Sequence, residues 1–93
     1  MHLSDDGKTL LCVTSSDIQE GRFIIPSTVN RIGEWAFRGC TNLTEVSIAE
    51  GVVVEMNAFE SCTGLTTVNL AKGAIVNFRA FESCTGLTTV NLA

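Results

Sequence analysis

The chain has 93 residues, 45% of them hydrophobic and 17% charged, and its formal net charge is −4. This length allows one small domain with a limited hydrophobic core. The six basic residues form no cluster that could neutralise a run of phosphates, which excludes nucleic acid as a partner. No stretch approaches the length of a transmembrane segment, so insertion into a membrane is excluded too.

The N-terminal segment, residues 1–22, predicts a β-hairpin. Two short apolar runs flank the Asp6-Gly7 dipeptide, which favours a tight turn between antiparallel strands. We expect this segment to form an N-terminal cap over the edge of the structure that follows. The opening residues lack the apolar segment of a signal peptide, which indicates either a cytosolic chain or one whose leader has been removed.

The next segment, residues 23–35, matches part of a repeat whose complete copies lie further along. Its apolar residues align with later ones at an offset of 23, but it has no counterpart of the Phe and Cys that the complete copies share. We interpret it as a partial first coil. The aligned residues are Phe23, Ile25, Pro26, Val29 and Ile32.

Three copies of one unit fill the rest of the chain. Residues 58–71 recur letter for letter as residues 80–93, an offset of 22, and a looser copy lies at 36–49 with the same offset. Repeats of this length are typical of solenoids, in which each unit stacks on its neighbours. We therefore expect coils that start near Ala36, Ala58 and Ala80, within a domain formed by residues 23–93.

Each copy has the pattern F-x-x-C-x-x-L-x-x-V-x-I/L. The spacing of three in its first part predicts a short helical turn, and the alternation in its last part predicts a short strand that pairs in parallel with the next copy. The return path uses the apolar residues 52–54 and 74–76, whose inward members are expected to complete the core. The apolar columns are Phe37/Phe59/Phe81, Cys40/Cys62/Cys84, Leu43/Leu65/Leu87, Val46/Val68/Val90 and Ile48/Leu70/Leu92.

The cysteine column predicts free, buried thiols. Equivalent positions in stacked coils point the same way about 4.8 Å apart, an orientation that disfavours a disulfide. A zinc site has no support, because the chain has one histidine, His2, and no C-x-x-C motif. The cysteines also lack a partner for nucleophilic catalysis. We predict no catalytic residue, metal or cofactor.

Polar residues alternate with the buried columns along the predicted strands and form a candidate partner-binding face. Such a face can bind an extended protein segment, or its residues can simply form ladders of cross-strand hydrogen bonds. Both interpretations stay open, as they do for Trp35, which is either an exposed anchor for a partner or a cover for the side of the stack. The residues of the face are Glu45, Ser47, Thr67, Asn69, Thr89 and Asn91.

The third copy stops at Ala93, directly after its strand, and no terminal cap is visible in the sequence. We expect either a fragment of a longer array or an uncapped C-terminal coil that associates with another copy of the chain.

The columns, together with IPSTVNRIGEWAF at residues 25–37, closely resemble the BspA-like (treponemal-type) leucine-rich repeats of bacterial surface proteins over residues 23–93. The family's repeat is usually one residue longer than the period found here and carries Ile-Pro and Ile-Gly pairs. Only the first coil, at Ile25-Pro26 and Ile32-Gly33, keeps both pairs. In the shorter coils Met56 and Phe78 could point inward or be exposed. The resemblance implies a right-handed solenoid for adhesion or protein binding, often at the cell surface, without catalytic residues.

The sequence therefore predicts an α/β repeat, a short right-handed leucine-rich repeat solenoid with parallel strands, short helical turns and a hairpin cap. Its predicted function is a non-catalytic module for protein–protein interaction or adhesion, and the resemblance alone implies a cell-surface or secreted location. Two alternatives remain, a structural spacer and a regulatory domain within a larger protein.

Overall fold

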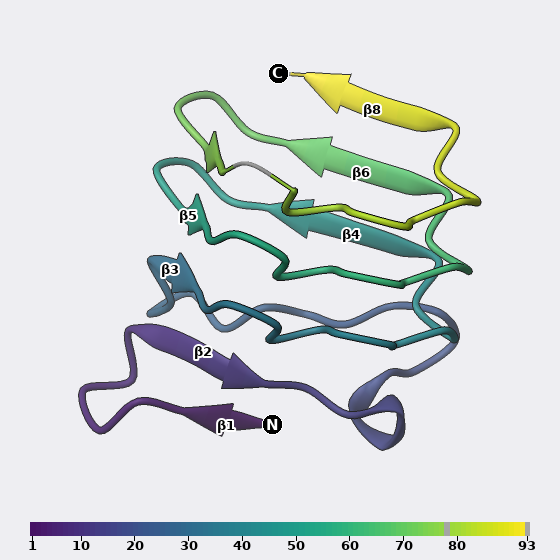
Figure 1. Cartoon of the computed structure of the whole chain (residues 1–93). Helices are drawn as coiled ribbons and strands as arrows, with labels where there is room; N and C mark the ends of the chain where they lie inside the picture. The colour runs from purple at the N-terminus through teal and green to yellow at the C-terminus, as the bar shows by residue number, and fades with distance from the viewer. Residues whose placement is uncertain (78, 93) are drawn as a thin grey trace.

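A computed structural model describes residues 1–77 and 79–92, which form a β-solenoid of about four turns (Figure 1). The chain climbs from the N-terminus at the bottom of the figure to the C-terminus at the top. We call residues 36–57 the first repeat, 58–79 the second and 80–93 the third, and we call the side of each coil that faces the C-terminus its upper side.

One sheet contains the longer strand of each repeat, in the order β4-β6-β8. The strands are parallel and in register, so that Val46, Val68 and Val90 lie side by side, each one repeat period after the last. This confirms the parallel stacking predicted from the period. The bounds are β4 Glu45–Ile48, β6 Thr67–Leu70 and β8 Thr89–Leu92.

A second sheet, in the order β1-β2-β3-β5-β7, covers the return path of each coil. The sequence predicted the apolar residues of this path but not that they pair as strands. Parallel pairing places Leu10, Ile32 and Val54 in one row, again separated by the repeat period. The bounds are β1 His2–Leu3, β2 Thr9–Cys12, β3 Arg31–Ile32, β5 Val53–Val54 and β7 Ile75–Val76.

The N-terminal segment is joined to the repeats through β2. Strands β1 and β2 pair antiparallel, and β2 then pairs in parallel with β3. The second strand of the predicted hairpin therefore lies in the same sheet as the repeat strands. The assignment of residues 1–22 as a separate cap stays a prediction, as does the right-handed winding.

The extra residue of the partial coil can be located from backbone pairing. Arg22 bridges to Glu45 at an offset of 23, whereas Arg31 pairs with Val53 at an offset of 22. The turn that ends at Val29 still matches the turn that ends at Val52. The additional residue is therefore Asn30, between that turn and β3.

The prediction of helical turns in the repeats is wrong. The segments from Ala-Phe to Cys are successive hydrogen-bonded turns, and among the described residues the single helix is a 3₁₀ helix, η1, at Ser15–Asp17. One residue in each segment has left-handed backbone, for example Gly39 (φ 71°), and so does the residue directly before the segment, for example Trp35 (φ 62°). A left-handed residue breaks a right-handed helical run, so the period of three in this part of the pattern marks turns.

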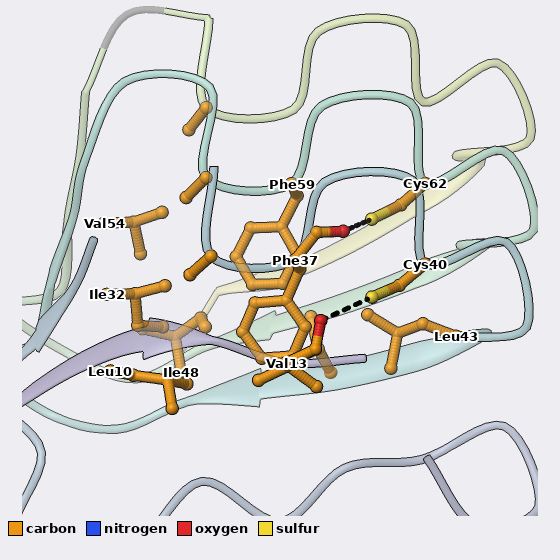
Figure 2. Close-up of a cluster of buried hydrophobic side chains, with 14 of the residues drawn as sticks. Leu10, Val13, Ile32, Phe37, Cys40, Leu43, Ile48, Val54, Phe59 and Cys62 are labelled. Atoms are coloured by element: carbon orange, nitrogen blue, oxygen red, sulfur yellow. Dashed lines mark hydrogen bonds between the residues drawn. The ribbon is translucent and has the colours of Figure 1, made fainter. Parts of the chain in front are cut away.

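The core is built from columns that run along the solenoid (Figure 2). The rings of Phe37 and Phe59 are stacked with centroids 4.5 Å apart, and those of Phe59 and Phe81 are 4.9 Å apart. Below them Val13 occupies the base of the phenylalanine column. In the first two repeats every member of the predicted columns is buried except Leu70, which is half-buried.

The columns become less buried toward the C-terminal end. In the leucine column, Leu43 and Leu65 are both 0% exposed, but Leu87 of the third repeat is only half-buried. Phe81 and Cys84 are half-buried in the same way, and all three pack against the edge of the core. The third repeat is less buried because, among the described residues, no coil covers its upper side.

Candidate functional site

The polar residues singled out in the sequence lie together on the outer side of the sheet β4-β6-β8. Side chains alternate along each strand, so that Val46 and Ile48 point into the core while Glu45 and Ser47 point away from it. Parallel register then aligns the outward residues in two rows. The rows are Glu45/Thr67/Thr89 and Ser47/Asn69/Asn91, and we call this surface the outer strand face.

Two further residues extend the outer strand face, and sequence analysis missed both. Because Arg22 bridges to Glu45, Arg22 continues the first row and Ile24 continues the second. Ile24 is 85% exposed, which makes it the most exposed large apolar residue among those described. The offset of the partial coil was the signal that could have placed them, since it aligns Phe23 with Val46 and so fixes its two neighbours.

Hydrogen bonds join the polar side chains of this face into one network. Arg22 Nη2 donates to Glu45 Oε1 at 3.0 Å, and Asn69 Nδ2 donates to Glu45 Oε2 at 2.9 Å and to Ser47 Oγ at 3.2 Å. Asn91 Nδ2 donates in turn to Asn69 Oδ1 at 2.7 Å. These contacts link side chains of neighbouring strands across the face.

Two shallow hollows lie on the outer strand face and share Ser47. The larger, of about 430 Å³, lies between the Ser47/Asn69/Asn91 row and the small side chains of Ala49 and Ala71 at the ends of the strands. The smaller, of about 220 Å³, lies beside Arg22 and Ile24. Together they give the face an apolar floor next to an ordered polar row, an arrangement typical of binding surfaces.

The four cysteines are free, and those of the column are hydrogen-bonded to the coil below. Cys62 donates its thiol to Phe37 O at 3.0 Å, and Cys40 donates to Val13 O at 3.4 Å (Figure 2). Burial raises the pKa of Cys40, and the neighbouring Cys84 thiol together with burial raises that of Cys62. Both thiols therefore stay protonated and act as structural donors.

The remaining candidates lie elsewhere in the described chain. Trp35 is 49% exposed, and the guanidinium of Arg38 lies 5.6 Å from the centre of its ring, a cation–π contact. Met56 is exposed, while Phe78 lies outside the described residues. Among the residues that the structure describes, no group of three His, Cys, Asp or Glu side chains is arranged to hold a metal ion.

A stack of parallel coils around an apolar core, in which each complete repeat has one long and one short strand, is typical of a leucine-rich repeat solenoid. Comparison with protein families makes the assignment specific. The BspA-type leucine-rich repeat region matches residues 15–93 in six copies, so the chain belongs to that family. No curated protein and no solved structure gives a significant match.

Proteins with leucine-rich repeats commonly mediate protein interactions. The fold is typically non-catalytic. In the parts of the chain that the structure describes, no helix is long and apolar enough to cross a membrane.

Proposed function

We propose that the chain is a non-catalytic module that binds a protein partner through the outer strand face. The main support for the proposal is that both hollows open on this one face and meet at Ser47. They lie beside the hydrogen-bond network that runs from Arg22 to Asn91. Solenoids generally use such extended repeat surfaces for binding.

The chemistry of the face favours a polypeptide over other partners. Its charged residues, Arg22 and Glu45, form an ion pair with each other, and the rest of the face is neutral. Hydroxyl and amide groups lie beside exposed apolar atoms of Ile24, Ala49 and Ala71. This mixture suits the backbone and small side chains of an extended protein segment.

The same network also supports a second interpretation, a structural spacer. Asn69 uses its amide nitrogen on Glu45 and Ser47 and its oxygen on Asn91, so most of the polar groups in the row already have partners within the protein. In a spacer these bonds would serve only to join the coils. The hollows are what distinguish the two interpretations, because a spacer makes no use of them.

A test should fill the larger hollow without breaking the network. In the 93-residue protein, Ala71→Trp places a bulky side chain in this hollow, and the neighbouring Lys72→Trp is a matched control outside it. Peptides selected from a displayed library on the wild-type protein should lose at least about tenfold in affinity for Ala71→Trp, the scale of a removed interface contact. They should bind Lys72→Trp unchanged.

Equal binding to all three proteins would favour the spacer. Charge reversal in Glu45→Lys adds a second arm, because it breaks both the pair with Arg22 and the bond from Asn69. We expect it to weaken binding of the same peptides.

Adhesion at a bacterial cell surface is the finer form of this proposal, and family membership alone supports it. A regulatory role within a larger protein would use the same face.

A further inference from the structure

The smaller hollow of the outer strand face lies where backbone pairing stops. Strands β4 and β6 pair over four residues, whereas among the described residues the segment before the first repeat pairs with β4 only in the bridge between Arg22 and Glu45. Beyond this bridge the hollow lies between residues 23–25 and Ser47. All of its lining residues fall between positions 22 and 47, so its shape is set by the first coils.

Arg22 is held at the hollow by its backbone and by one end of its side chain. Its N–H donates to Gln19 O at 2.9 Å, and its carbonyl oxygen accepts from Gln19 N at 2.8 Å. Within residues 1–77 and 79–92, the bond from Nη2 to Glu45 Oε1 is the one hydrogen bond of its guanidinium. A guanidinium has five N–H groups, and this side chain is 66% exposed. Arg22 therefore keeps donors for a second acceptor.

The acceptor groups of the same hollow are already in use. Both oxygens of Glu45 accept a hydrogen bond, from Arg22 and from Asn69, and its side chain is only 32% exposed. Ser47 Oγ accepts from Asn69 and keeps its hydroxyl hydrogen to donate. The polar groups left for a partner are therefore mainly donors, with a positive charge at Arg22. They lie beside Ile24, which is 85% exposed.

A positively charged donor next to an exposed apolar side chain suits a carboxylate with an apolar neighbour, because the planar guanidinium matches the two oxygens of a carboxylate. We propose that the smaller hollow is a carboxylate subsite, in which an aspartate or glutamate side chain of the bound protein segment accepts from Arg22 and Ser47 while an apolar neighbour packs on Ile24. The hollow is shallow, so the segment crosses it, and the carboxylate belongs to a side chain and not to a chain end. This inference rests on the proposed function, since it names a residue that the partner places on the outer strand face.

The test uses the 93-residue protein and peptides selected on it from a displayed library of random sequences. These peptides should be enriched in an aspartate or glutamate next to an apolar residue, and peptides selected on Arg22→Gln should lack this enrichment. A selected peptide is then synthesised as a C-terminal amide. Changing its acidic residue to the matching amide, or changing the protein by Arg22→Gln, should each weaken binding roughly three- to tenfold, between the effects of an exposed ion pair and of a charge-assisted hydrogen bond. The two changes together should cost no more than either alone.

Two further variants control for the ion pair. Arg38→Gln is matched to Arg22→Gln, because Arg38 is similarly exposed, at 62%, and is paired with Glu60 away from the outer strand face. It should bind the peptide unchanged. The double variant Arg22→Gln with Glu45→Gln should bind as weakly as Arg22→Gln alone. Recovery of affinity in the double variant would overturn the subsite, because the loss would then come from repulsion by an unpaired Glu45.

The remaining outcomes separate this inference from the proposed function. Peptides that lose affinity for Ala71→Trp but bind Arg22→Gln unchanged would overturn the carboxylate subsite and leave the proposed function intact. Binding that neither variant affects would overturn both. A peptide that binds only with a free C-terminal carboxylate, and not as the amide, would overturn the assignment to a side chain.

Discussion

The second and third repeats place the same sequence in two different surroundings. Residues 58–71 and 80–93 are identical, yet Val68 is 1% exposed and Val90 is 51% exposed. Phe59 is buried and Phe81 is only half-buried. Because the two sequences are identical, the difference in burial arises from the coil that lies above the second repeat. Burial in this fold is therefore set by position in the stack.

Contacts with the coil below, in contrast, are nearly the same in both repeats. Cys62 and Cys84 make thiol hydrogen bonds of equal length, and each phenylalanine stacks on the ring beneath it. A residue's contribution to stability thus divides into a downward part that both repeats share and an upward part that only the second repeat has. Paired substitutions can measure the two parts separately.

The largest difference in stability loss between the second and third repeats is expected when a charge is placed in the valine column. Val68→Asp buries a carboxylate without a partner and should cost more than about 4 kcal/mol, enough to unfold a domain of this size. Val90→Asp leaves the carboxylate near water and should cost under about 1 kcal/mol. Urea denaturation followed by circular dichroism measures both. Equal losses would show that Val90 is covered in solution.

Removal of a stacked ring should also cost more stability in the second repeat than in the third, but the difference should be smaller. Phe59→Ala removes contacts with rings both above and below and should cost about 3–5 kcal/mol. Phe81 stacks on one described ring, so Phe81→Ala should cost roughly half as much. The ratio of the two losses, obtained from the same denaturation experiment, estimates how the energy of the column divides between its two sides.

The glycines of the turns test the downward contacts alone. A Cβ atom at Gly64 would be in hard contact with Thr41 O, and one at Gly86 would lie 2.6 Å from Thr63 O. Gly64→Ala and Gly86→Ala should therefore both cost roughly 1–3 kcal/mol through overpacking. Similar losses at the two sites are the expected result. A harmless Gly86→Ala would mean that the third repeat is only loosely seated on the second.

The smallest effect is expected for glycine substitutions in the turns, which should stabilise the second and third repeats equally. Ser61 and Ser83 both have φ 61°, in the left-handed region that favours glycine. Ser61→Gly and Ser83→Gly should each stabilise the fold by about 0.5–1 kcal/mol. Glycine relieves the backbone strain, and this gain exceeds the conformational entropy that glycine loses on folding. Asn57→Gly should gain less, because asparagine tolerates this conformation and its side chain also donates to Glu60 and Glu82. Thermal melts can resolve the gains.

Sequence analysis recovered the features that repeat and missed those that do not. The repeat period aligned Val46 with Val68 and Val90, and the outward rows followed from alternation along the strands. Strand β2 was missed as part of the solenoid, because around Leu10 the sequence does not match the repeat and only the backbone pairing with Ile32 shows the relation.

The turns and the hollows were beyond prediction for a different reason. Apolar residues at every third position fit a helix as well as successive turns, and nothing in Trp35 or Ser61 indicates a left-handed backbone, whereas Gly39 does. The larger hollow depends on the small size of Ala49 and Ala71 beside a longer amide row. That is a property of side chains brought together by the fold.

The exact repetition of residues 58–71 also creates an ambiguity during folding. A chain in which residues 80–93 settle directly on the first repeat, with residues 58–79 extruded as a loop, would match the same apolar columns in a slipped register. Such a species would lose one coil interface but none of the complementarity at the interfaces that remain. Refolding therefore has a near-degenerate competitor, and sequence differences between neighbouring repeats, as between the first and second, protect against it.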